Sequence, residues 1–167
     1  MSGTNPLTPE YPAPWRSSLQ EADESSVAVP FVVPTDADAN QDNLTDVWMP
    51  RDGSRVILDF KSPGPTNPPI RQEYIEIYFG RWSLGDPSEL YLQSVRDKPE
   101  NKRIIRIDGI TALVNEPRSP HDLEQANPAL LRMVVGGNLE VQISGGDNIE
   151  RIIRIAENVA EHLPSKS

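Results

Sequence analysis

The sequence has no cysteine in its 167 residues and only two histidines, His121 and His162. The absence of cysteine excludes disulfide bonds, thiolate metal sites and cysteine nucleophiles. No serine or aspartate pattern around His121 is typical of a catalytic triad. His162 is explained by its place at the end of an expected helix, where a cationic side chain is favourable. We therefore expect no catalytic residue, no metal site and no cofactor.

Long apolar runs and basic clusters are also missing. The first thirty residues contain no apolar stretch of signal-peptide length, and nothing downstream is long enough to span a membrane. The sequence as it stands therefore indicates a soluble, cytoplasmic chain, or an extracytoplasmic one if it is part of a longer anchored protein. Without a basic patch, nucleic acid is not an expected partner.

Proline and negative charge are abundant and unevenly distributed. The 17 prolines are about twice the usual share of roughly 5%. Residues 1–50 carry eight acidic residues against a single basic one, Arg16, which gives them −7 of the total net charge of −9. We predict a disordered, acidic, proline-rich arm over residues 1–25, a single domain over residues 26–163 and a short tail over residues 164–167.

The clearest secondary-structure signal follows Gly145-Gly146. Asp147 and Glu150 have the spacing of a capping box, with Asp in place of Ser or Thr. The apolar residues that come next recur at helical spacing and form one stripe. They are Ile149, Ile152, Ile153, Ala156, Val159, Ala160 and Leu163. Such a helix must pack against an apolar surface.

The segments before this helix read as strands. Residues 74–80 alternate apolar and polar side chains, which is typical of a strand with one buried face. Residues 50–53, Asp108-Gly109 and residues 136–138 have the composition of hairpin turns. Hairpins imply antiparallel neighbours, because parallel strands need long crossovers.

Two further segments are assigned as strands. Residues 27–33 suit an edge position because Pro30 interrupts them, and residues 89–95 form a weaker candidate. The expected fold is therefore α+β, with a curved antiparallel meander sheet built from hairpins and packed by one C-terminal amphipathic helix.

The sheet face opposite the helix is the expected binding surface. Tyr74 and Tyr78 lie on that face of their strand, and Trp48 and Trp82 are further aromatic candidates near it. An exposed aromatic surface binds a ligand or partner, although proline-rich segments could equally cover this face. These four residues are the candidate ligand-binding or partner-binding site.

One loop has the beginning of a calcium-binding pattern. Asp36, Asp38, Asn40 and Asp42 alternate as in the front half of an EF-hand loop. The pattern then fails, because no glycine occupies the turn position and Val47 stands where a bidentate glutamate is required. A flexible acidic loop is favoured over a weak calcium site.

Five segments stand out when the order of elements is considered: VPFVVPTDAD, SRVILDF, YIEIYFG, IRIDGITALV and the final LLRMVVGGNLEVQISGGDNIERIIRIAENV. In these segments, over about residues 27–163, the chain resembles a family of uncharacterised bacterial domains that commonly form the extracytoplasmic part of sporulation or anti-sigma-factor-like membrane proteins. The linkers at residues 61–72 and 115–129 are particular to this chain, and it shows no anchoring helix. The resemblance implies a sheet-plus-helix fold and supplies no catalytic residues.

Three functions remain open. The leading hypothesis is a non-catalytic binding or accessory domain that engages a protein partner or a small apolar ligand through its sheet face. The second is a small hydrolase or isomerase that uses scattered carboxylates and His121, the only candidate base of neutral pKa. The third is a structural or secretion-related component that works through its acidic arm.

Overall fold

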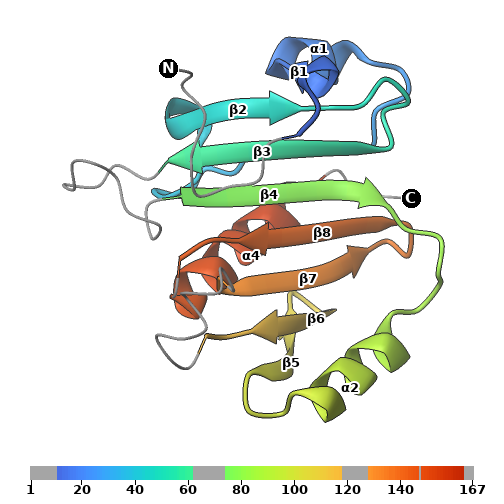
Figure 1. Ribbon diagram of the computed structural model, residues 1–167, viewed down its shortest axis with the longest axis vertical. Coiled ribbons are helices and arrows are strands. Elements are labelled where there is room, and N and C mark those ends of the chain that lie inside the picture. The colour runs from blue at the N-terminus through green and yellow to red at the C-terminus, as the bar shows by residue number, and fades with distance from the viewer. Residues whose placement is uncertain (1–10, 62–73, 118–127, 147, 164–167) are drawn as a thin grey trace.

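The computed structural model describes residues 11–61, 74–117, 128–146 and 148–163. Its main element is one antiparallel sheet of eight strands in the order β1-β2-β3-β4-β8-β7-β6-β5 (Figure 1). The strands are β1 (Arg16–Ser17), β2 (Leu44–Trp48), β3 (Arg55–Lys61), β4 (Tyr74–Arg81), β5 (Lys102–Ile107), β6 (Ile110–Asn115), β7 (Leu130–Val135) and β8 (Leu139–Ser144). The helices are α1 (Leu19–Glu24), α2 (Ser88–Asp97) and α4 (Ile149–His162), with 3-10 turns η1 (Ala13–Trp15) and η2 (Gln41–Asn43). The predicted α+β class, with a C-terminal helix on an antiparallel sheet, is confirmed.

The sheet consists of two four-stranded meanders joined edge to edge. Strands β1 to β4 pair in sequence order, β5 to β8 do the same, and β4 pairs with β8 along the seam. The chain therefore leaves β4 at the centre of the sheet and enters β5 at the far edge. Helix α2 lies in that connection (Figure 1).

The predicted hairpins are present, and their turns explain two unusual backbone conformations. Asp108 and Gly109 have φ values of 50° and 82°, as a two-residue turn between twisted strands requires. Gly53 has φ 66°, and a Cβ atom there would also collide with the backbone of Val27. The turn between β2 and β3 therefore needs glycine for both conformation and space.

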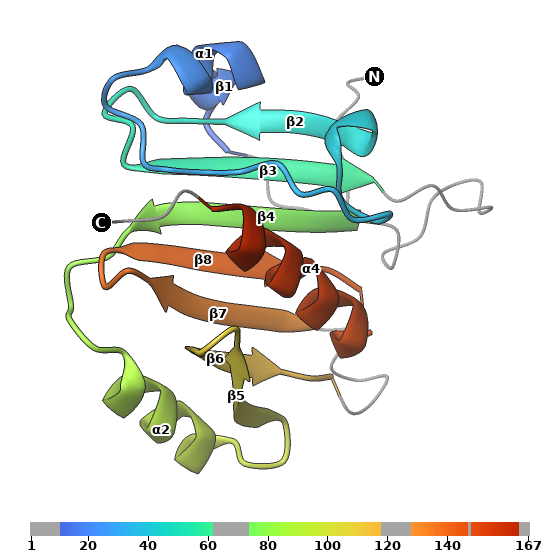
Figure 2. The same ribbon diagram turned by 180° about the vertical axis from the view of Figure 1, so that it is seen from behind.

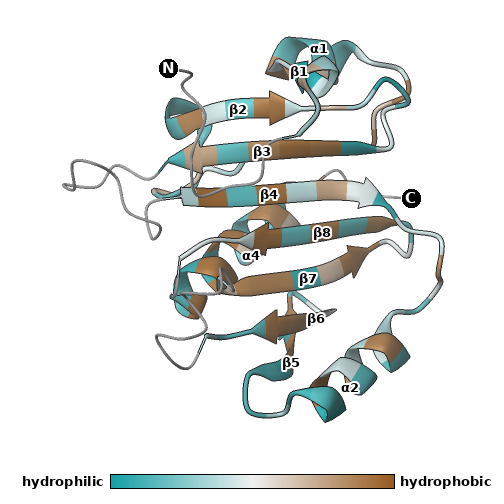
Figure 3. Ribbon diagram, in the orientation of Figure 1, coloured by the Kyte–Doolittle hydropathy of each residue, from teal (hydrophilic) through white to brown (hydrophobic). Residues whose placement is uncertain are grey.

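One face of the sheet forms the core. Apolar side chains at alternate positions of β3, β4, β7 and β8 point to this face, and Figure 3 shows the alternation along β4 and β8. Its largest fully buried members include Phe60, Phe79, Ile77, Met133 and Ile143. Figure 2 shows α4 lying across β7 and β8 on this face, and residues 28–39 running along β3 and β4 beside it.

Helix α4 begins one residue later than the sequence indicated. Its N-cap is Asn148, whose side chain accepts hydrogen bonds from the backbone N–H groups of Glu150 and Arg151. Asp147, the predicted cap, lies outside the described residues. The apolar stripe is confirmed at Ile149, Ile152, Ala156 and Val159, and Ile155 joins it as a fully buried residue.

Residues 27–33 are not an edge strand as predicted. They form an extended cover over the core, in which Val29 is buried and its N–H donates to Gly53 O at 2.9 Å. The Phe31 ring lies 6.3 Å from the Phe79 ring. The segment therefore contributes side chains to the core, and Pro30 breaks the backbone pairing that a strand would need.

Two other expectations differ from the structure. Residues 13–24, expected to belong to a loosely attached arm, form η1, β1 and α1, and Ala22 of α1 is buried. Residues 89–95, expected to form a strand, belong to α2. Ser18 caps α1 by accepting a hydrogen bond from the N–H of Glu21. This capping residue is a local helix signal, but it stands in a proline-rich, acidic segment whose composition favours disorder.

We predict that Ile152→Ala lowers the free energy of unfolding by about 2–5 kcal/mol, because the side chain is fully buried between α4 and the sheet. Ile153→Ala is the matched control, since Ile153 is only partly buried on the same helix and is expected to lose roughly half as much or less. Urea denaturation measures both. Equal losses would contradict the placement of α4.

The second face of the sheet carries polar side chains, including a pair of carboxyl groups. Asp59 of β3 and Glu76 of β4 are directly opposite each other, and Asp59 is buried. Asp59 accepts from Trp48 Nε1 at 3.0 Å, and Glu76 accepts from the Tyr11 hydroxyl at 2.9 Å. Burial, together with the neighbouring carboxyl of Glu76, raises the pKa of Asp59 to about 9. Asp59 therefore keeps its proton at neutral pH.

The proton retained by Asp59 predicts a pH-dependent stability. Folded Asp59 keeps a proton that the unfolded chain releases above about pH 4, so the free energy of unfolding falls as pH rises from about 4 to about 9. Asp59→Asn imitates the protonated group, and we expect it to flatten this slope between pH 5 and 8 in thermal melts. Asp23→Asn, on the exposed surface of α1, should keep the wild-type slope. A slope unchanged by Asp59→Asn would contradict the retention of a proton by Asp59.

Candidate functional site

The candidate site is a pocket between α2 and the second face of the sheet. At the start of α2, Asp86 Oδ1 accepts from the backbone N–H of Ser88 at 2.9 Å and fixes the first turn. Tyr91 and Ser94 are three positions apart and lie on one side of the helix, and Lys98 is its C-cap. Tyr91 is buried, and Ser94 and Lys98 line the pocket.

The sheet supplies the floor of the pocket from β5, β6 and β7. Lys102, Asn115 and Leu130 pair side by side across these three strands. Leu113 and Arg132 form the neighbouring pair. These residues alternate with the core residues of their strands and so face away from α4. The cavity has a volume of about 290 Å³ and is lined by Ser94, Lys98, Asn101, Lys102, Leu113, Asn115, Leu130 and Arg132.

The pocket is strongly cationic for a chain of net charge −9. Lys98, Lys102 and Arg132 line it, and none of its described lining residues is acidic. The Lys102 ammonium donates to the neutral Ser94 hydroxyl at 2.9 Å. Arg132 donates to Glu140, a buried carboxylate next to the pocket, at 3.0 Å. One of the three cations is therefore paired with a carboxylate within the described part of the chain.

Two hydrogen-bond donors near the pocket are buried without an acceptor among the described residues: the Tyr91 hydroxyl and Nε of Arg132. Burial raises the pKa of Tyr91 to about 12, so its hydroxyl stays protonated and able to donate. Unsatisfied buried donors are costly, and an acceptor at this place would relieve that cost.

The structure does not gather the four predicted aromatic residues into one site. Tyr78 is half-buried on the second face, and its neighbour Gln142 on β8 lies opposite Arg132 on β7. Tyr78 is therefore two strands, or roughly 10 Å, from the pocket. Tyr74 shares the face but lies near the start of β4, at the level of Lys61.

The two tryptophans are placed differently from the tyrosines. Trp48 is on the second face but only 3% exposed, because Tyr11 packs against its ring at 5.5 Å and Arg16 lies over it at 4.5 Å. Trp82 follows β4 in a loop, where its indole N–H donates to Gly85 O. It lines a separate hollow of about 340 Å³ with residues 28–30. Neither tryptophan reaches the pocket beneath α2.

The pocket residues were missed because residues 89–95 were read as a strand. A composition signal for them was present, since residues 96–106 hold five basic residues against two acidic ones. On a strand such charges would be spread along an edge. On the helix and the strand that follows it, Lys98 and Lys102 line the same cavity.

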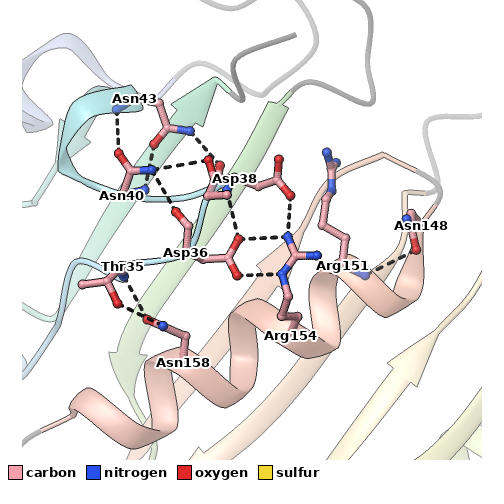
Figure 4. Close-up of polar contacts among 10 residues, drawn as sticks. Thr35, Asp36, Asp38, Asn40, Asn43, Asn148, Arg151, Arg154 and Asn158 are labelled. Atoms are coloured by element: carbon pink, nitrogen blue, oxygen red, sulfur yellow. Dashed lines mark hydrogen bonds and ion pairs between the residues drawn. The ribbon is translucent and has the colours of Figure 1, made fainter.

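The acidic loop that resembled half an EF-hand serves as a structural tie to α4 (Figure 4). Arg154 donates to both carboxylate oxygens of Asp36, at 2.7 and 2.9 Å, and also to Asp38. The Arg154 guanidinium holds the pKa of Asp36 below its usual range. Asn40 and Asn43 close the loop by exchanging hydrogen bonds between side chains and backbone. The loop is therefore fastened to α4 by an arginine.

We predict that Arg154→Ala lowers the free energy of unfolding by about 1–2 kcal/mol, because it leaves the buried carboxylate of Asp36 without its bidentate partner. Glu157→Ala, an exposed position on the same helix, should change it by less than about 0.5 kcal/mol. Chemical denaturation compares the two. An Arg154→Ala variant as stable as the wild type would remove this tie from the account.

Of the two histidines, only His162 lies in the described part of the chain. His162 Nδ1 lies 2.8 Å from Asn158 O in the exposed last turn of α4, and His121 lies outside the described residues. Within the described ranges, no three His, Asp or Glu side chains are grouped so as to hold a metal ion. No helix in these ranges is long and apolar enough to cross a membrane.

Comparisons of the chain with protein-family models, with curated proteins and with solved structures found no match. The residues of the site are therefore interpreted from their own geometry.

Proposed function

We propose that this chain is a non-catalytic binding domain that takes a small-molecule ligand in the pocket between α2 and the second face of its sheet. The observation that carries the proposal is the cavity itself, in which side chains from one helix and three strands converge on about 290 Å³. A concave site of this size with a few polar groups and some apolar lining is typical of small-ligand binding.

The lining favours a polar ligand over a purely apolar one. Among the described lining residues, Leu113 and Leu130 are the large apolar ones, and the other six are polar or charged. Tyr78 and Tyr74 lie further along the same face and remain candidates for extra contacts with a larger ligand. Trp48 supports the face from beneath Tyr11 and is not proposed as a contact.

An enzymatic function has less support. The only carboxyl group in the described ranges whose pKa is clearly raised is that of Asp59, and it is covered by Trp48 and Tyr11 rather than open to the pocket. A raised pKa in a covered structural pair supplies no access for a substrate. The resemblance to extracytoplasmic bacterial domains is compatible with an accessory role beside a protein partner, and we keep that role as a second proposal.

We predict that Ser94→Phe blocks ligand binding, because the ring occupies the cavity beneath α2. The matched control is Gln93→Phe, which places the same ring on the exposed side of the helix. A library of anionic, cationic and neutral metabolites is screened by ligand-detected NMR against both variants and the wild type. Hits should bind the wild type and Gln93→Phe and lose at least tenfold in affinity with Ser94→Phe.

Folding of the variants is checked separately, since overpacking destabilises proteins. Asn115→Phe fills the same pocket from the sheet side and replaces Ser94→Phe if the latter does not melt cooperatively. Hits that bind both filled variants as well as the wild type would show that the pocket is not the binding site.

A further inference from the structure

We infer that the ligand of the α2 pocket carries an oxyanion group, either a carboxylate or a phosphate, attached to a small body with some apolar surface. This inference rests on the proposed function and adds the chemical class of the ligand. It is carried by the charge on the pocket walls, by the pairing state of each cation and by the position of the two leucines.

One row of side chains across the second face has acidic residues at one end and a lysine at the other. This row of cross-strand neighbours begins with Asp46, Asp59 and Glu76 on β2, β3 and β4. It continues through uncharged side chains on β8, β7 and β6 and ends at Lys102 on β5. In this row the acidic residues lie on β2 to β4, and its one basic residue lies under α2. The pocket is positive even though the chain as a whole is negative.

The lysines of the pocket are not neutralised by the described part of the chain. Lys98 forms no ion pair there, and Lys102 donates only to a neutral hydroxyl. The two residues stand on different elements, four positions apart in sequence, and both line the cavity. Two like charges facing one cavity repel each other, and a bound anion converts that repulsion into two favourable contacts.

Arg132 completes the anion site from the floor. Glu140 holds its guanidinium through one Nη atom, and the buried Nε–H has no acceptor among the described residues. The nearby Tyr91 hydroxyl is a second buried donor without an acceptor there. Carboxylate and phosphate oxygens accept several hydrogen bonds at once, whereas a cationic ligand would meet only repulsion from Lys98 and Lys102.

Leu113 and Leu130 require part of the ligand to be apolar. They lie on adjacent strands within the same lining, and Leu113 is 5% exposed. An organic body attached to the anionic group covers these side chains, which free phosphate cannot do. An organic anion therefore fits the pocket better than an inorganic one.

The test uses probes that share one body and differ in the head group: benzoate, phenyl phosphate and the neutral benzamide, with inorganic phosphate as a body-free anion. Binding to the intact chain is followed by two-dimensional amide NMR up to roughly 10 mM, the range in which fragment-sized ligands bind. We expect benzoate or phenyl phosphate, or both, to shift the amide signals of Lys98, Lys102 and Leu113. Benzamide should bind at least tenfold more weakly.

Variants that remove charges then show whether the pocket lysines are responsible for anion binding. Lys98→Gln with Lys102→Gln should weaken anion binding at least tenfold, and neither change removes a partner from a described carboxylate. Arg96→Gln, an exposed charge on α2 outside the pocket, should stay within twofold. Binding should also weaken as salt is raised from about 20 to about 300 mM, since screening shortens the reach of the lysine charges.

The outcomes separate the two proposals. If benzoate is the one anion that binds, the head group of the ligand is a carboxylate. If phenyl phosphate is the one that binds, the head group is a phosphate. Two results would overturn the anion inference while leaving the proposed binding domain intact. One is that benzamide binds as tightly as benzoate. The other is that no anion shifts the amide signals, while neutral metabolites bind the wild type and lose binding in Ser94→Phe. Loss of every pocket-directed ligand, with hits unaffected by pocket filling, would overturn the proposed function itself.

Discussion

Helix α4 and residues 28–39 pack against one face of the sheet, and this packing leaves the opposite face as the surface on which the remaining elements lie. Apolar side chains of the central strands are fully buried on that first face. Neither the 14-residue α4 nor the extended segment covers it alone, and Figure 2 shows them lying beside each other across it. Their contact is fixed by polar ties, of which the bidentate bond from Arg154 to Asp36 is the most buried. Hydrophobic burial therefore holds α4 and residues 28–39 on the first face of the sheet. The ion pair between Arg154 and Asp36 fixes how these two segments lie relative to each other.

With the first face occupied, the remaining elements pack on the second. The chain must travel from β4 at the centre to β5 at the far edge, and it does so through α2, whose inner side chains meet β5, β6 and β7 from the face opposite α4. At the other end, Tyr11 and η1 cover Trp48 and the Asp59–Glu76 pair. The second face is thus covered at its two ends by different means. The end under α2 keeps a cavity because the inner side of α2 is mostly polar, with Tyr91 as its only buried residue.

The sequence predicts the architecture well where local signals and burial agree. The isoleucine stripe follows helical periodicity, residues 74–80 follow strand periodicity, and the hairpin turns follow from their glycine-containing composition. Each of these local signals was confirmed. The errors occur where tertiary contacts decide. Residues 27–33 look like a strand, yet Pro30 and the space beside Phe79 make them a cover. Residues 89–95 have a strand-like pattern of apolar residues, yet they are helical. The hydrogen bond from Ser88 N–H to Asp86 fixes the first turn, and the Tyr91 side chain is buried on one side of the helix.

The candidate site was harder to predict than the fold for the same reason. An aromatic surface can be listed from sequence, but whether Trp48 is exposed depends on Tyr11, which is 37 positions away in the chain. The pocket joins Lys98 to Arg132 through the pairing of β6 with β7, whose connection over residues 116–129 has no hairpin signal in the sequence. Sequence reasoning therefore pointed to the sheet face opposite α4 but not to the part of that face that forms a cavity.

The account depends most on α2 lying over the second face, with the sheet between it and α4. Paramagnetic relaxation tests this placement directly, because a single nitroxide can be attached at Gln93→Cys in a chain that has no other cysteine. We predict strong broadening of the methyl signals of Leu113 and Leu130, with much weaker broadening of those of Ile152 and Ile155 on α4. Equal broadening of the two sets, or none at Leu113 and Leu130, would show that α2 does not close the pocket.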